Sequence, residues 1–374
     1  MKIVRVEARA LNVHLEFEAA GRKHAADRPM NYVEIETDGG LIGHGASGHA
    51  QPEPVASLIN RVLGPKLEGA DPFAIEALWD DMHRALAGRG QSGIGWNALS
   101  MLDTALWDIK GKAVGQPLWR LLGGRQRLPL YATLPHGPGI DTGALARQYL
   151  AEGFSAIKLV VGGAARHGTG KVNSLNGSLE GDIAQVRALR EAAGERAEIF
   201  LSAQCSYSLP QALAFARGVK PYSVALFQEP VAGNDPDVLA RFRRESGIPT
   251  TVGHSLSSLE RFRDVLTAGA ADYVSPNVIT CGGYTGALRA GAVARAFGVP
   301  IVQSGAWFHH NMHFYAAAPA GTLGEWFELS DILPSKLLYT GLPMQSGGWL
   351  TLPEAPGLGF EPDRDALKEW TVPH

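Results

Sequence analysis

The second half of the chain alternates short apolar segments with helical ones, and this alternation limits the fold more than any other feature. Eight segments between residues 129 and 329 have the length and composition of buried strands: PLYATL, AIKLVV, IFLSA, VALFQE, TTVGH, ADYVSP, PIVQSG and EWFEL. Helical segments such as DIAQVRALREAA and LERFRDVLTAG separate them. Eight strand–helix units favour a closed, parallel (β/α)8 barrel. A doubly wound sheet is the alternative, but no GxGxxG motif follows the first strand.

Residues 1–126 follow a different pattern and predict a separate α+β domain. Residues 2–16 alternate as in a strand, and the Asp-Gly-Gly sequence at 38–40 is typical of a hairpin turn between two further strands. The segment 17–30 lacks a period, and we expect a loop there. Apolar residues then recur every three or four positions as far as Leu122, which indicates helices.

Gly123 and Gly124 end this helical block, so we place the domain boundary at residue 126. The barrel is expected over residues 127–344. The Gly- and Pro-rich segment 345–374 is expected to run back and complete the N-terminal domain. The predicted fold class is therefore α/β, a modified (β/α)8 TIM-type barrel with an N-terminal α+β capping domain.

The charge balance excludes some partners and locations. The chain has 34 Lys and Arg against 37 Asp and Glu, a net charge of −3, with no run of five like charges. This gives no reason to expect nucleic acid or a membrane as a partner. Cys205 and Cys281 are too few for a disulfide framework, no apolar run reaches 18 residues, and the N-terminus lacks a signal-peptide core. We therefore expect a cytoplasmic protein, with Cys205 as a buried, unreactive thiol.

The segment 97–124 has the sequence NALSMLDTALWDIKGKAVGQPLWRLLGG. It resembles the A-x-D-x-A-L-W-D-x-x-G-K-x-x-G-x-P-x-x-x-L-L-G-G signature of the mandelate racemase/muconate lactonizing branch of the enolase superfamily, and it is the strongest match to that family in the chain. GFSAIKLVVG resembles its K-x-K strand, FQEP its E-x-P strand and PEAPGLGF its P-x-x-P-G-L-G ending. The resemblance extends in order along nearly the whole chain, and it implies a capping domain over a modified barrel.

The resemblance also implies a mechanism in which three carboxylates at the ends of successive strands hold Mg²⁺. The metal binds the substrate carboxylate and stabilises the enediolate that forms when a base removes the α-proton. At the matching positions this chain has Ser202, Gln228 and His254, with Gln204 also in the segment that matches the family's D-x-N motif. The intervals from 202 to 228 and from 228 to 254 are both 26 residues, as one strand–helix unit per position would give. Because none of these side chains is an anionic oxygen ligand, we predict no Mg²⁺ and no other cofactor.

The acid–base groups that the resemblance implies are also reduced. Lys158 matches the first lysine of the K-x-K strand, but Val160 takes the place of the second. Asn277 stands where many members have Asp. Gln303 or Ser304 stands where a His would be. The usual bases on both sides of the substrate are therefore incomplete.

The ionisable groups that remain are the predicted catalytic residues: Lys158, His254 and Glu325. Glu325 matches a carboxylic acid that mandelate racemase uses at the eighth strand. We expect Lys158 to be a general base or to bind a carboxylate, while His254 and Glu325 exchange protons. The structural alternatives are a salt-bridged lysine, a capping-domain ion pair and a core histidine bonded to backbone. Glu229 should face the helices, since neighbouring strand residues point to opposite faces.

Neutral polar side chains at the strand ends suit a hydroxylated or amide-bearing ligand. The predicted substrate-binding residues are Ser202, Gln204, Gln228, Asn277, Gln303, Ser304, Trp307 and His309. His309 and His313 could share a metal on one face of a helix, but no third ligand is evident, and we expect them to line the site or to pack. The Gly- and Ser-rich loop 162–181 is either a lid or a solvated loop or subunit contact, and its basic residues are Arg166, His167 and Lys171.

The sequence thus predicts an enzyme with altered, Mg²⁺-independent acid–base chemistry. It would be a lyase or isomerase acting on a small polar carboxylate or a sugar-derived substrate. One alternative is an inactive family member that binds a ligand or a partner. Another is a conventional Mg²⁺-dependent acid-sugar dehydratase or racemase. The expected partner is a small molecule, and we expect a homo-oligomer.

Overall fold

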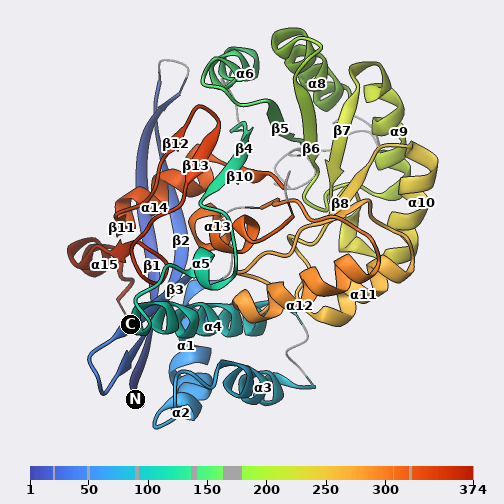
Figure 1. The fold of residues 1–374 in the computed structure, drawn as a ribbon. Helices are drawn as coiled ribbons and strands as arrows, with labels where there is room; N and C mark the ends of the chain where they lie inside the picture. Colours follow the sequence, from blue (N-terminus) through green and yellow to red (C-terminus); the bar gives the residue numbers. More distant parts are fainter. Residues whose placement is uncertain are drawn as a thin grey trace.

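The computed structural model describes residues 1–19, 22–48, 51–88, 92–135, 141–162, 179–305, 307–319 and 322–373. Figure 1 shows an antiparallel sheet and helices formed by the N-terminal part, and beside them a ring of strands surrounded by helices. The antiparallel sheet consists of β1 (Ile3–Ala19), β2 (Arg22–Thr37) and β3 (Ile42–Gly48), paired in that order.

The first two strands form a long hairpin that the sequence did not predict. They pair along almost their whole length, as far as Ala19 opposite Arg22. The expected loop over 17–30 is therefore wrong, because residues 22–30 belong to β2. Backbone pairing with β1 holds this segment extended even though its side chains show no apolar period. The apolar residues of the hairpin that are buried include Val13, Leu15 and Met30.

The N-terminal part also contains helices. They are α1 (Pro52–Leu58), η1 (Ile59–Leu63), α2 (Gly64–Leu67), α3 (Ile75–Leu86), α4 (Ile94–Ala113) and α5 (Leu118–Leu121). The sheet packs closely on α4 through two glycines of β3. A Cβ atom at Gly43 would lie 2.1 Å from the carbonyl oxygen of Ala105, and one at Gly45 would lie 2.3 Å from that of Met101. Any larger residue would push the helix away from the strand.

The barrel predicted from the alternating pattern is present. Its parallel strands follow one another in chain order: β4 (Arg127–Thr133), β5 (Ala156–Val160), β6 (Glu198–Ser202), β7 (Val224–Gln228), β8 (Thr250–Val252) and β9 (Tyr273–Val274). At the seventh position Ile301 forms only a bridge to Val274. The eighth strand, β10 (Gly324–Trp326), pairs in parallel with β4. The N–H of Gln303 donates to the carbonyl oxygen of Leu323, which joins the seventh position to β10 and closes the ring.

Helices lie outside the ring, as Figure 1 shows. They are α6 (Thr142–Ala151), α8 (Leu179–Ala193), α9 (Leu209–Val219), η2 (Lys220–Tyr222), η3 (Ala232–Asn234), α10 (Pro236–Ser246), α11 (Leu259–Thr267), α12 (Gly283–Ala296) and α13 (Phe308–Ala316). Several start at side-chain caps: the Asp235 carboxylate accepts from the N–H groups of Asp237 and Val238, which begins α10. Among the described residues, no helix is both long and apolar enough to cross a membrane.

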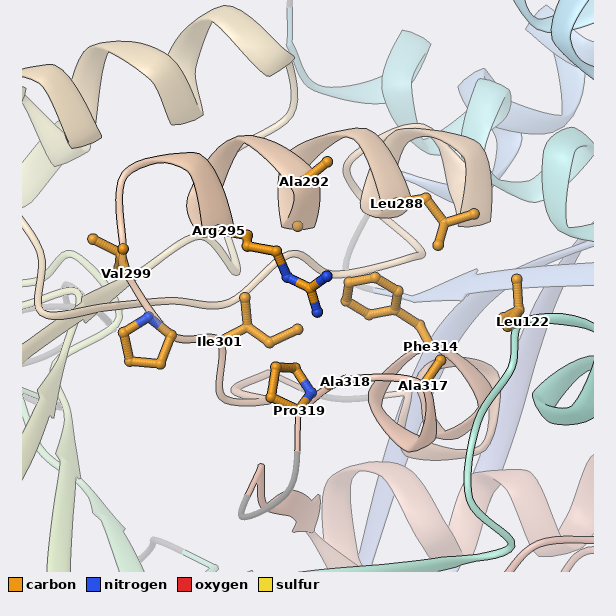
Figure 2. A pocket seen from close by; sticks show the side chains of 13 residues that line it. Leu122, Leu288, Ala292, Arg295, Val299, Ile301, Phe314, Ala317, Ala318 and Pro319 are labelled. Atoms are coloured by element: carbon orange, nitrogen blue, oxygen red, sulfur yellow. The ribbon is translucent and has the colours of Figure 1, made fainter.

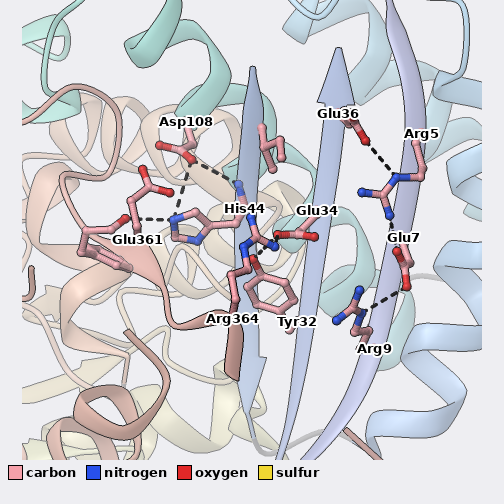
Figure 3. Close-up of polar contacts among 12 residues, drawn as sticks. Arg5, Glu7, Arg9, Tyr32, Glu34, Glu36, His44, Asp108, Glu361 and Arg364 are labelled. Atoms are coloured by element: carbon pink, nitrogen blue, oxygen red, sulfur yellow. Dashed lines mark hydrogen bonds and ion pairs between the residues drawn. The ribbon is translucent and has the colours of Figure 1, made fainter. Parts of the chain in front are cut away.

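The C-terminal segment contacts both parts of the molecule. It comprises η4 (Glu328–Ile332), α14 (Leu333–Leu338), β11 (Tyr339–Thr340), β12 (Gln345–Ser346), β13 (Trp349–Thr351), β14 (Glu361–Pro362) and α15 (Arg364–Trp370). β13 pairs antiparallel with β4 of the barrel. Figure 3 shows the contacts with the capping sheet, where Arg364 forms an ion pair with buried Glu34, and Asp108 of α4 accepts from the N–H of His44 at 3.1 Å.

Candidate active site

A buried ion pair lies at the centre of the barrel. Lys158 is the third residue of β5 and Glu325 the second of β10, and these strands flank β4. The Lys158 Nζ lies 2.5 Å from the Glu325 Oε1, and the two side chains are only 4% and 2% exposed. Two of the three predicted catalytic residues are therefore in direct contact.

Hydrogen bonds from several strands hold this ion pair. The Thr133 hydroxyl donates to the Glu325 Oε1 at 2.5 Å, and the Gly305 N–H donates to the other carboxylate oxygen. The Lys158 Nζ donates to the Gln228 Oε1 at 2.9 Å and lies 3.4 Å from the Tyr131 hydroxyl. Buried charges are tolerated when their hydrogen-bonding capacity is satisfied, and these contacts satisfy it.

The surroundings shift the pKa values of Lys158 and Glu325 in directions that suit proton transfer. Burial lowers the pKa of Lys158, and the Glu325 carboxylate offsets this only in part. A lysine with a lowered pKa reaches the neutral form that a general base needs. Burial alone would raise the pKa of Glu325, but Lys158 and the donors from Thr133 and Gly305 hold it below its usual range. Glu325 is thus kept as the anion beside the amine.

The third predicted catalytic residue, His254, lies at the same mouth of the barrel. It follows β8, and its Nδ1 lies 3.1 Å from the Nδ2 of Asn277, which follows β9. Gly305, with φ of 100°, packs directly against the imidazole, since a Cβ there would lie 1.8 Å from the His254 Nδ1. Because the N–H of Gly305 binds Glu325, this glycine connects His254 to the central ion pair. A side chain at position 305 would push the His254 ring away from the backbone that binds Glu325.

The predicted substrate-binding residues divide into two groups. Ser202 and Gln228 are paired residues at the ends of neighbouring strands β6 and β7. The Gln303 Oε1 accepts from the Glu325 N–H at 3.2 Å, and the Ser304 hydroxyl bonds that of Ser275. These residues therefore lie around the ion pair, with Asn277 beside His254. Gln204 is half-buried in the turn after β6 with φ of 45°.

His309 and Trp307 lie elsewhere. The His309 Nε2 bonds the carbonyl oxygen of Pro343 at 3.1 Å, and its ring packs against Phe360 of the C-terminal segment. His309 is thus buried beside the C-terminal segment, and its part in substrate binding stays a prediction. Trp307 lies between Gly48 of the capping sheet and His310. Arg166, His167 and Lys171 lie outside the described residues.

Three further side chains test the sequence interpretation. Glu229 does not face the helices as predicted: its φ is 44°, and its carboxylate accepts from the Ser255 N–H at 2.9 Å and the Ser255 hydroxyl at 2.7 Å. The strand ends at Gln228, so the alternation of faces ends there too. Cys205 is half-buried, and burial raises the pKa of its thiol, which agrees with an unreactive cysteine. His313 uses both ring nitrogens for backbone contacts and does not share a metal with His309.

The residues at the implied magnesium positions do not fit Mg²⁺. Ser202, Gln228 and His254 supply no carboxylate, and the Gln228 Oε1 already accepts from the Lys158 ammonium. Glu229 is turned toward Ser255. Across the described part of the chain, no cluster of three His, Cys, Asp or Glu side chains could hold a metal ion. The absence of Mg²⁺ from the working enzyme remains a prediction.

Sequence reasoning missed four supporting residues. Tyr131 and Thr133 lie on the first barrel strand, where their alternation with Ala132 could have shown that they face inward. Gly305 and Asn311 carried no recognisable signal, because their roles depend on a close approach and on an amide bond between distant segments.

Two cavities lie near the barrel. One cavity has a volume of about 740 Å³, and its lining includes Trp96 of α4, Cys205 and Ser255. In the sequence Cys205 follows Gln204 and Ser255 follows His254, so this cavity adjoins the site. Figure 2 shows the other, of about 470 Å³, between α12 and α13, with apolar walls and Arg295 projecting into it. Its lining includes Pro300 and Ile301, at the start of the seventh strand position. Neither Lys158 nor Glu325 lines it, so this cavity is separate from the ion pair.

Comparisons with known proteins identify the family. The model of the mandelate racemase/muconate lactonizing enzyme N-terminal domain matches residues 5–123, and that of the enolase C-terminal domain-like family matches residues 141–366. The chain belongs to the mandelate racemase/muconate lactonizing enzyme branch of the enolase superfamily, and it is an enzyme of the lyase or isomerase type.

Several relatives are similar along all or most of their length. The D-galactarolactone cycloisomerase of Agrobacterium fabrum is 31% identical over 397 residues, which cover 100% of both chains. The arabinonate dehydratase of Saccharolobus solfataricus is 29% identical over 361 residues, 92% of each chain. The crystal structure of a racemase from Streptomyces coelicolor with bound magnesium superimposes with a TM-score of 0.84 at 28% identity, covering 99% of this chain and 100% of that one.

Proposed function

We propose that this enzyme removes the proton next to the carbonyl group of a sugar acid or sugar-acid lactone without a metal ion. The observation that carries the proposal is the Lys158–Glu325 ion pair, 2.5 Å across and buried at the centre of the barrel. A cycloisomerase that acts on a sugar-acid lactone and a dehydratase that acts on a sugar acid are among the relatives, which supports this substrate class.

Lys158 acts as the general base in this scheme. In its neutral form it takes the α-proton and becomes an ammonium ion beside the Glu325 carboxylate, which stabilises it. The electrons of the broken C–H bond move onto the carbonyl oxygen of the substrate. A lyase then expels the β-hydroxyl as water, whereas an isomerase returns a proton at another position. The Lys158 ammonium, which has taken up the α-proton, supplies the proton in both cases, either to the leaving hydroxyl or to the carbon that receives it.

The absence of carboxylate ligands favours a lactone over a free carboxylate. Removing a proton next to a carboxylate gives a doubly charged intermediate, which relatives of the usual kind stabilise with a metal. The carbonyl group of a lactone is uncharged, so its enolate carries one negative charge fewer. One ammonium and a set of neutral donors are better matched to that charge.

The proposal predicts activity that does not depend on a divalent cation. Galactarolactone, galactonate and arabinonate incubated with the enzyme in D₂O should show exchange or conversion for at least one of them, followed by proton NMR. The rate should be the same after treatment with EDTA and after adding Mg²⁺. Activity that EDTA abolishes and Mg²⁺ restores would contradict the proposal. No turnover with any sugar acid or lactone would favour a ligand-binding role.

A further inference from the structure

A chain of amide hydrogen bonds determines which nitrogen of His254 carries the proton. The Asn311 Oδ1 accepts from the Val278 N–H at 2.8 Å, which leaves its Nδ2 to donate to the Asn277 Oδ1 at 2.9 Å. The Asn277 Nδ2 is then the group that lies 3.1 Å from the His254 Nδ1. An amide NH₂ can only donate, so the Nδ1 accepts, and the proton of the neutral ring is on Nε2.

The two other positions that match metal ligands in the family also carry donors. The Gln228 Oε1 accepts from the Lys158 Nζ at 2.9 Å, so its NH₂ group is the end directed away from the lysine. The Ser202 Oγ is fully buried at the end of β6 and has no hydrogen-bond partner among the described residues. A buried hydroxyl without a partner is destabilising, and a ligand that accepts its hydrogen bond would remove that cost.

We propose that Ser202, Gln228 and His254 form an oxyanion-binding set for the carbonyl oxygen of the substrate. Asn277 and Asn311 are positioning residues that hold the His254 Nε2–H as the donor. The inference rests on the proposed function, because the charge on that oxygen develops only when the neighbouring proton leaves. Each donor is fixed by bonds made elsewhere in the fold, so the site needs little rearrangement as the charge develops.

The first test concerns the tautomer of His254 in the full chain. Histidine labelled with ¹⁵N and observed by long-range ¹H–¹⁵N NMR should show His254 with its proton on Nε2, and the Asn277→Asp variant should move it to Nδ1, since a carboxylate accepts. The matched control is Asn12→Asp, the same change at an exposed position of β1. A wild-type His254 protonated on Nδ1 would overturn the proposal.

The second test uses tetronate, the singly charged enolate of a β-keto lactone, whose charged oxygen resembles that of a lactone enolate. Calorimetry in the presence of EDTA should detect tetronate binding to the wild type, weakened about tenfold or more by Asn277→Asp and by Ser202→Ala. Ser202→Ala removes an unpartnered hydroxyl, so its thermal stability should be unchanged or higher. Tetronate affinity that is absent from the wild type, or equal in the wild type and both variants, would overturn the proposal. Neither test needs turnover, so a wrong assignment of the reaction would leave both results unchanged.

Discussion

Replacing Lys158 with Met is expected to abolish turnover and to destabilise the protein. The loss of a positioned general base should lower the rate by about 10²–10⁴-fold. The Glu325 carboxylate would then be buried without its counter-ion, which typically costs about 3–5 kcal/mol of unfolding free energy. Exchange of the α-proton in D₂O measures the first effect, and urea unfolding measures the second.

A second substitution separates the catalytic effect from the structural one. In the double variant Lys158→Met/Glu325→Gln both charges are absent, so most of the lost unfolding free energy should return while turnover stays absent. Lys112→Met is the matched control: Lys112 pairs with buried Asp108 at 2.9 Å in the capping domain, so its loss should cost stability but not activity. Normal turnover in Lys158→Met would show that Lys158 is not the base.

The strand ends could be predicted from the sequence because the barrel repeats. One strand and one helix occupy nearly constant lengths, so a motif at Ser202 places Gln228 and His254 at the same mouth. The contact between Lys158 and Glu325 could not be predicted in this way. It depends on closure of the ring, which puts β10 next to β4 and one strand away from β5.

Other features depend on contacts that no local pattern records. The β1–β2 hairpin contains a stretch without an apolar period, and it is a strand because β1 supplies its hydrogen bonds. Glu229 follows the last residue of β7, where the alternation that was used to place it no longer applies. His309 stands four residues from His313 as a helical metal pair would, but the C-terminal segment packs over both. Tertiary packing therefore decided each of these outcomes.

The same C-terminal contacts produce a cluster of buried histidines that should make the protein sensitive to acid. Burial lowers the pKa of His44, of His309 and of His313 to about 4 in each case. His310 lies among them, and burial lowers its pKa well below the usual value. In His313 the Nδ1 accepts from the Trp119 N–H, so a second ring proton cannot be added without breaking that bond.

The sign of the pH dependence follows from these shifts. An unfolded histidine takes up a proton below about pH 6.5, whereas the folded ring resists protonation until about pH 4. Unfolding therefore binds protons in this range, and stability falls as the pH falls through it. Each histidine with a folded pKa of about 4 contributes on the order of 3 kcal/mol to this loss. In urea unfolding between about pH 8 and about pH 5 these histidines therefore decrease the free energy of unfolding, whereas Asp103 and Asp331, whose pKa burial raises to about 7, act in the opposite direction.

Replacing His310 with Phe should remove part of that decrease. The ring centroid of His310 lies 5.3 Å from that of Phe360 and 5.8 Å from that of Tyr339, and its nitrogens have no hydrogen-bond partner within the described residues. A phenyl ring fits the same aromatic contacts without a group that the unfolded chain can protonate. Urea unfolding measures the difference in the free energy of unfolding between the variant and wild type. This difference should be about 2 kcal/mol more favourable to the variant at about pH 5 than at about pH 8. An equal slope in wild type and His310→Phe would show that His310 takes no part in the acid sensitivity.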